Sequence, residues 1–213
     1  MKPFSNLIII FTLFTFLSCK NENTLSEYKY SDQETLLNCD SPDSKLWNEA
    51  IYSFENDIRT FYANNYYSKD GDLYLFYSDF IVRYIKGMVV FEDLISPHTL
   101  EVFNVLKNRP ELWNLENTVS KLNYYSPLFN CIAANVQDND LKTTLNALLT
   151  THSMSPRMFT SPLSTQSRTV ANDPYLRAYV AFDLFYAKLF DIDVSKVKDR
   201  EPKLDKNLNT QIN

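Results

Sequence analysis

The chain has 213 residues and a formal net charge of −5. This acidic balance argues against nucleic-acid binding, because such proteins need a positive face to displace the counterions of the phosphates. The whole chain holds two glycines, so it has no Gly-rich phosphate loop, no dinucleotide fingerprint and no Gly-x-Ser-x-Gly nucleophile elbow. Composition therefore excludes these classes of enzyme, and we expect no bound cofactor.

The N-terminus has the pattern of a secretion signal. Lys2 provides a positive start, and an apolar run follows at residues 7–17. A membrane-spanning helix needs about 20 apolar residues, so this run is too short to cross a bilayer. Residues 1–18 are therefore predicted to be a signal peptide that directs export.

The end of this signal, Leu17-Ser18-Cys19, resembles the lipobox of bacterial lipoproteins. The resemblance implies that Cys19 becomes the first mature residue and carries acyl chains, which makes the lipid bilayer a partner. More than one chain gives a firm anchor, since a single chain holds a protein to a membrane only marginally. Lys20 stands where Asp would favour the inner membrane, so the resemblance implies the outer membrane of the cell envelope. The alternative is an uncleaved hydrophobic anchor.

The polarity of the chain divides it into four parts. Behind the signal we expect the lipidated cysteine and a polar tether at 19–40, one helical domain at 41–193 and a polar tail at 194–213. Apolar side chains at three- and four-residue spacing predict helices, and the scarcity of glycine disfavours β-hairpins. We therefore predict an all-α single domain of six or seven helices, packed as an irregular bundle or an orthogonal array.

Two cysteines remain if Cys19 is acylated, namely Cys39 and Cys131. Thiols of exported proteins often pair, because the compartment is oxidising. We therefore expect a disulfide between these two residues, and the alternative is two unpaired thiols. The bridge would close a loop of about 90 residues, which the chain-entropy model values at about 4–5 kcal/mol.

Helix starts are marked by a capping residue followed by proline. Such pairs occur at Ser41-Pro42, Ser96-Pro97, Ser126-Pro127 and Asp173-Pro174. The expected helices cover 42–64, 72–94, 97–107, 110–124, 127–136, 139–151 and 174–191. Residues 152–172 are rich in Ser, Thr and Pro and are expected to form a long loop, a type of segment that is often functional. The second helix is apolar on several sides, so we expect it at the centre, with Gly87 permitting close approach of a neighbouring helix.

Candidate catalytic and metal-binding residues are few. His98 and His152 lie far apart without a metal-ligand motif, so we predict no metal site and expect His98 to be an ordinary surface residue. No Ser-His-Asp signature is present, and no catalytic residue is assigned. Four carboxylates bracket the second expected helix: Asp70, Asp72, Glu92 and Asp93. Paired carboxylates can hydrolyse glycosidic bonds, although Asp72 is also a favourable helix cap.

Aromatic residues are unusually abundant, with 15 Phe, 14 Tyr and 2 Trp. Tyr66, Tyr67 and Tyr74 cluster around the turn between the first two expected helices and belong to neither apolar stripe. Exposed tyrosines suit glycan or protein binding, because the ring offers flat area and the hydroxyl a hydrogen bond at low entropy cost. We predict these three as ligand-binding residues, and the alternative is ordinary packing.

The lack of a catalytic signature favours a non-enzymatic role. We expect an envelope-anchored lipoprotein that binds a protein, peptide or glycan near Tyr66–Tyr74 or through residues 152–172. One alternative is a cell-wall or glycan hydrolase, which a cleft with two desolvated carboxylates would favour. Another is a structural subunit of an envelope complex, which an apolar face left on the outside would favour.

Overall fold

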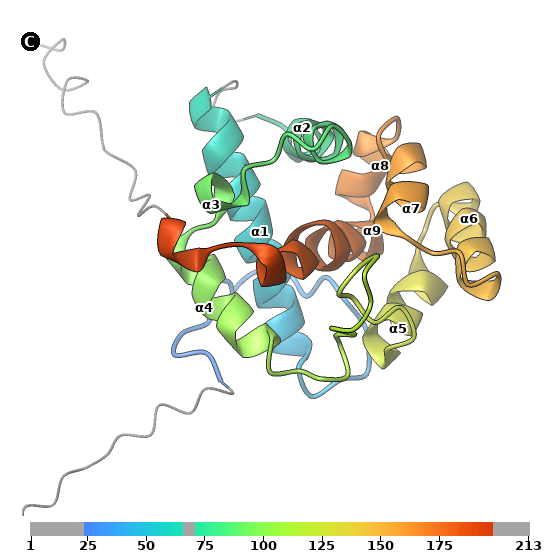
Figure 1. Ribbon diagram of the computed structural model, residues 1–213, viewed down its shortest axis with the longest axis horizontal. Helices are drawn as coiled ribbons and strands as arrows, with labels where there is room; N and C mark the ends of the chain where they lie inside the picture. Colours follow the sequence, from blue (N-terminus) through green and yellow to red (C-terminus); the bar gives the residue numbers. More distant parts are fainter. Residues whose placement is uncertain (1–23, 66–70, 198–213) are drawn as a thin grey trace, which may run out of the picture.

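Residues 24–65 and 71–197 are described by a computed structural model (Figure 1). Within these ranges the chain is helical, without a β-strand and with one isolated bridge between Trp113 and Leu122. The predicted all-α class is confirmed, but the described residues form nine α-helices rather than six or seven. They are α1 (Ser44–Asn65), α2 (Leu73–Ile85), α3 (Phe91–Leu94), α4 (Pro97–Leu106), α5 (Pro127–Asn135), α6 (Asn139–Thr150), α7 (Pro156–Leu163), α8 (Ser167–Asn172) and α9 (Pro174–Tyr179).

The centre of the molecule is the C-terminal helical segment, not the second helix as predicted. α9 continues into a π-helical turn, η1 (Val180–Phe185), and then a 3-10 turn, η2 (Tyr186–Asp191). Every side chain from residue 178 to residue 187 is at most 2 % exposed, as expected for a helix that is apolar almost all round. Figure 1 shows this segment between α3 and α4 on one side and α5 to α8 on the other. The single helix predicted at 174–191 therefore changes its winding twice.

α1 carries the predicted apolar stripe into this core. It contacts α2, α3, α4 and η1, so it packs against the centre and against several of the surrounding helices. The buried apolar members of the stripe are Leu46, Trp47, Ala50, Ile51, Phe54, Ile58 and Tyr62. Because these residues recur every three or four positions, they share one face of the helix.

α2 ends at Ile85, well before its predicted end. Gly87 adopts a φ of +64°, and the N–H groups of Gly87 and Met88 donate to the carbonyls of Tyr84 (3.0 Å) and Arg83 (2.8 Å). This is a Schellman cap, in which glycine takes the left-handed position after the helix. The expectation of a close neighbouring helix at Gly87 is wrong, because a Cβ at this position would meet nothing within 4 Å.

The Ser/Thr/Pro-rich segment at 152–172 contains α7 and α8, so the predicted loop is wrong. α7 begins at the pair Ser155-Pro156, where the Ser155 hydroxyl accepts a hydrogen bond from the Met158 N–H at 3.3 Å. The same capping signal is confirmed for α4, α5 and α9, at Ser96, Ser126 and Asp173. The Ser-Pro pair therefore marked the start of α7 in the sequence, but the polar composition of residues 152–172 suggested a loop.

The predicted helix at 110–124 is replaced by a compact turn. Trp113 takes part in the isolated antiparallel bridge, and its indole N–H donates to the Leu106 carbonyl at 2.7 Å. The Asn117 side-chain oxygen accepts from the Val119 N–H at 2.9 Å. Local bonds of this kind offer the backbone an alternative to the helix, so apolar spacing misled the prediction here.

The described part of the predicted tether packs on the helices. Leu25 and Leu37 are buried. The backbone N–H groups of Lys29 and Tyr30 donate to the carboxylate of Glu49 on α1, at 2.8 and 3.0 Å. The expectation of a free polar tether is therefore wrong for this segment, because two leucines and a buried acceptor attach it to the domain.

Candidate ligand-binding site

Three predicted site residues lie outside the part of the chain that the structure describes. They are Cys19, the predicted lipidation site, and Tyr66 and Tyr67 of the predicted tyrosine patch. The predicted signal peptide at 1–18 also lies outside it. The other predicted site residues, Cys39, Cys131 and Tyr74, are described.

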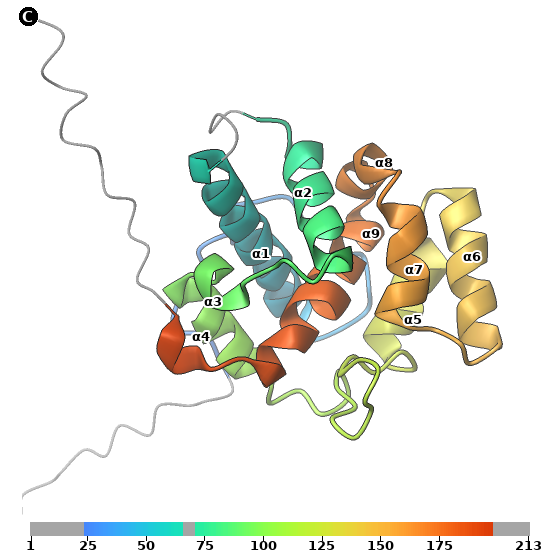
Figure 2. The ribbon, with the colours of Figure 1, turned by 45° about the horizontal axis from the view of Figure 1, so that its top comes forward.

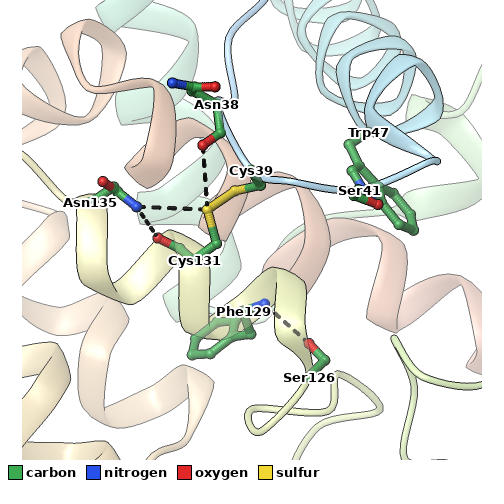
Figure 3. Close-up of a disulfide and its surroundings, with 8 residues drawn as sticks. All are labelled: Asn38, Cys39, Ser41, Trp47, Ser126, Phe129, Cys131 and Asn135. Carbon is green, nitrogen blue, oxygen red and sulfur yellow. Dashed lines mark hydrogen bonds between the residues drawn. A yellow bond between two sulfur atoms is a disulfide. The ribbon is translucent and has the colours of Figure 1, made fainter.

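Cys39 and Cys131 form a disulfide between the segment before α1 and α5, with their Cα atoms 5.9 Å apart (Figure 3). The pairing expected from the sequence is therefore present. Asn135, one turn further along α5, donates its side-chain N–H to the Cys131 carbonyl at 2.9 Å and lies 3.6 Å from the Cys131 sulfur. The bridge joins residues 92 positions apart, so it ties the segment before α1 to α5.

Tyr74 is part-buried, and one face of its ring is occupied. The guanidinium carbon of Arg168 on α8 lies 3.7 Å from the centroid of this ring, which is the geometry of a cation–π contact. α8 belongs to the segment 152–172 and packs against α2, so the structure brings the two sequence-predicted binding regions side by side. The ring face under Arg168 is not free for a ligand, and Tyr74 serves the packing of α8 on α2.

His98 is buried, which corrects the prediction of a surface residue. It is 6 % exposed, and its Nε2 lies 2.6 Å from Oε1 of Glu49. Glu49 also accepts the N–H groups of Lys29 and Tyr30. Both side chains are enclosed between α1, α4 and the N-terminal segment, so the pair holds these elements together and does not meet a substrate.

The carboxylates that bracket α2 do not build the geometry of a glycosidase in the described residues. Asp70 lies outside them, and Asp72 occupies the N-cap position of α2 without a side-chain capping bond. Glu92 and Asp93 line a cavity of about 490 Å³ beside Lys196. They are consecutive residues of one helical turn, and such neighbours do not face each other. A substrate would therefore not lie between them.

Asp183 is the one charged residue in the central apolar segment from 178 to 187, and it is fully buried. It accepts hydrogen bonds from Ser120 Oγ at 2.5 Å and from the Tyr124 hydroxyl at 3.1 Å to each oxygen. Burial raises the pKa of Asp183 to about 6, although hydroxyl donors such as Ser120 and the charge of Lys188 act to lower it. No sequence motif marked Asp183 as a buried acid. The available indication was its position as the single acidic residue within the apolar segment from 178 to 187.

A cavity of about 970 Å³ is lined by residues from the C-terminal end of α2, from α7 and from η2. Figure 2 shows the ribbons of α2 and α7 beside the C-terminal helical segment. Small-molecule sites usually measure about 300–1,000 Å³, so this cavity is at the upper end of the range. Its apolar wall is formed by Ile85, Val89, Phe91, Val119 and Pro156. Hydroxyl groups are supplied by Tyr84, Ser155, Thr160 and Ser161, and positive charge by Arg157 and Lys188. The described lining contains no carboxylate.

Local signals in the sequence create both walls of this cavity. The Schellman cap at Gly87 ends α2 and turns the chain, so that Val89 and Phe91 follow as lining residues. The pair Ser155-Pro156 starts α7 on the opposite wall. Lys188 comes from η2, at the end of the central segment.

The described lining of the cavity carries positive charge, and the buried carboxylate of Asp183 lies near enough to act on Tyr84 and Lys188. Neither Arg157 nor Lys188 forms an ion pair with a carboxylate of the described residues. The Lys188 ammonium lies 6.0 Å from the centroid of the Tyr84 ring. Burial and the nearby charge of Asp183 raise the pKa of Tyr84, so its hydroxyl stays protonated and can donate. The cavity therefore combines two cations, hydroxyl donors and an apolar wall.

In 24–65 and 71–197, no group of three or more His, Cys, Asp or Glu side chains is placed to hold a metal ion. The same ranges contain no helix with both the length and the apolar character needed to cross a membrane. The chain matches no protein-family model, no curated protein and no solved structure. Function therefore has to be inferred from the site, since a fold alone does not define it.

Proposed function

We propose that the protein is an envelope-anchored lipoprotein whose helical domain binds a ligand without catalysing a reaction. The observation that carries the proposal is the cavity between α2, α7 and η2, which has the volume of a ligand site. Its described lining has no histidine or carboxylate to activate Ser155 or Ser161 as a nucleophile. Lys188, the remaining base, makes no hydrogen bond to either serine, so the lining favours binding over catalysis.

The N-terminal sequence and the disulfide support the envelope location. Residues 1–18 have the pattern of a signal peptide, and Cys19 stands at the acylated position of a lipobox. The Cys39–Cys131 disulfide fits an oxidising compartment. In this proposal Cys19 carries the acyl chains and holds the domain at the outer membrane.

A second candidate is a protein-contact role within an envelope complex. Ile85 and Val119 line the cavity and are 51 % and 52 % exposed. Three further exposed apolar side chains are adjacent in sequence to lining residues: Met88, Val90 and Met158. Exposed apolar side chains that gather in one region are typical of a surface that another molecule covers.

The test of the binding proposal is recovery of a bound molecule from the full-length protein purified from its native membranes. Ser161 is exposed on α7 and lines the cavity, so Ser161→Trp is expected to obstruct the cavity and leave the core intact. Thr165 is exposed just beyond α7 and outside the lining, so Thr165→Trp is the matched control. Mass spectrometry of extracts should find the same ligand with the wild type and Thr165→Trp, and lose it with Ser161→Trp.

Two results would contradict the binding proposal. One is recovery of the same molecules from the wild type, Ser161→Trp and Thr165→Trp, which would mean that the ligand does not bind in the cavity. The other is the absence of any specific molecule from each of them. The anchoring is tested separately by feeding cells an alkyne analogue of palmitate, which should label the wild type but not Cys19→Ala.

A further inference from the structure

We propose that this cavity binds a single-chain anionic amphiphile, whose head group contacts Lys188 and Arg157 and whose chain lies along the apolar wall. The inference rests on the proposed binding function and names the chemical class of the ligand. It combines the charge, the donors and the apolar surface that the described lining brings together.

The charge of the lining is opposite to that of the whole chain. The protein carries a net charge of −5, but the described lining holds Arg157 and Lys188 and no acid. Two part-buried arginines elsewhere are paired with carboxylates: Arg177 lies 2.6 Å from Glu55, and Arg109 lies 2.9 Å from Asp43. Lys188 is part-buried and forms no ion pair with a described carboxylate, although it interacts at longer range with Asp183. A charge held partly away from water is stabilised by an opposite charge, which an anionic head group would supply.

The donors near these cations suit a carboxylate or phosphate head. Ser161 and Tyr84 carry hydroxyl groups in the lining. Thr160 is committed elsewhere, because its hydroxyl donates to the Pro156 carbonyl. The cavity also meets the first turn of α7, where the helix dipole adds partial positive charge to that of the two side chains.

The apolar wall argues for an amphiphile rather than a small inorganic anion. Ile85 is the last residue of α2, Val89 and Phe91 follow it, and Val119 lines the same cavity. A phosphate or sulfate ion would leave these side chains in water, whereas an alkyl chain would cover them. Burial of apolar area stabilises a complex by about 25 cal/mol per Å² before the costs of association. An amphiphile, which has both a charged head group and an alkyl chain, would therefore contact both the cations and the apolar side chains of the lining.

The experiment uses the full-length protein in a non-ionic detergent and a photoreactive, alkyne-tagged palmitic acid. The corresponding alcohol is the neutral comparison, and a single-chain lysophosphatidic acid analogue is the phosphate comparison. Saturable labelling should map to peptides of α2, α7 or η2. Cys19 peptides are excluded from the count, because metabolic acylation is a different reaction.

Variants test the role of the charges. Lys188→Met and Arg157→Met remove the charges but keep the aliphatic stems. In the double variant, saturable labelling by both the palmitic acid and the lysophosphatidic acid probe should fall about tenfold or more, because the charge-assisted hydrogen bonds to the head group are lost. Lys107→Met removes an exposed lysine outside the lining and should label as the wild type does. The alcohol should label weakly in every variant.

Equal labelling by acid and alcohol, or acid labelling that survives the double change, would overturn the inference. These failures are distinguishable from failure of the binding proposal. If Ser161→Trp still removes a native ligand, the cavity is a binding site for another chemical class. If Ser161→Trp removes nothing, both proposals fail.

Discussion

Two regions of the molecule carry ionisable side chains in different surroundings: the buried interior and the cavity, where Lys188 is part-buried and Arg157 is exposed. In the interior, Arg177 forms a bidentate pair with Glu55, at 2.6 and 2.7 Å, and Asp183 accepts three hydrogen bonds. At the cavity, Lys188 and Arg157 have no carboxylate partner among the described residues. The interior charges therefore stabilise the fold through paired contacts, whereas the cavity cations form no such pair and, in our proposal, bind the head group of a ligand.

The interior pairs also connect elements that lie far apart in the sequence. Glu55 is on α1, Arg177 on α9, and the hydroxyl of Tyr77 on α2 donates to the same Glu55 at 2.7 Å. Three helices therefore meet at one carboxylate. Changes in the interior should reduce stability, while changes at the cavity should alter binding with little effect on stability, and this contrast can be measured.

The largest loss of stability is expected when the disulfide between α5 and the segment before α1 is removed. Cys39→Ser with Cys131→Ser should lower the free energy of unfolding by about 4–5 kcal/mol, because the unfolded chain regains the entropy of a long loop. Urea unfolding of the oxidised wild type and the double variant measures the difference. Adding reductant should destabilise the wild type alone, and an equal effect on both proteins would contradict the assignment.

The next largest loss of stability is expected at the carboxylate of Glu55, where α1, α2 and α9 meet. Arg177→Met leaves the buried carboxylate of Glu55 without its cation, which should cost about 3–5 kcal/mol. Chemical unfolding gives the value directly. Lys107→Met is the control, since changes at exposed sites usually stay within about 0.5 kcal/mol. A similar small effect for Arg177→Met would show that the pair does not hold α9 on α1.

The third prediction is a dependence on pH that comes from Asp183. Its pKa is raised from 3.8 in the unfolded chain to about 6 in the fold, so the folded state binds the proton more tightly. The contribution of Asp183 to stability is therefore fully present below about pH 4 and is lost as pH rises through 6, by about 3 kcal/mol in total. Asp183→Asn should remove this fall, because the amide oxygen can still accept from Ser120.

Unfolding of the wild type and Asp183→Asn at pH 4 and pH 7 measures this effect. The variant should gain stability relative to the wild type between the two values. Asp191→Asn, which changes an exposed acid at the end of η2, should give no such relative gain. A constant difference between wild type and Asp183→Asn at both pH values would contradict the prediction.

The smallest change in stability is expected at the cavity. Lys188→Met and Arg157→Met break no ion pair with a described carboxylate. At pH 4, where Asp183 is protonated in the fold and does not need the charge of Lys188, each should shift the free energy of unfolding by no more than about 0.5 kcal/mol. The same urea titrations test this expectation. A loss of several kcal/mol would mean that these cations support the fold, and the contrast between interior and cavity would disappear.

Local and compositional signals in the sequence determined much of the fold. The scarcity of glycine and the spacing of apolar residues in α1 predicted the all-α class, because both act within a few residues of the chain. Ser96, Ser126 and Asp173 marked helix starts for the same reason. Ser155-Pro156 is another pair of a capping residue and proline, and it marks the start of α7 in the same way.

Tertiary structure alone decided the environment of the ionisable residues. His98 is buried because Glu49, 49 positions away, faces it. Asp183 is held by Ser120, 63 positions away in the chain. The cavity likewise joins residues of α2, α7 and η2, and no local pattern encodes such a meeting. The sequence by itself therefore determined the helical class and several helix starts, whereas the packing of distant helices decided which charges are paired and which line the cavity.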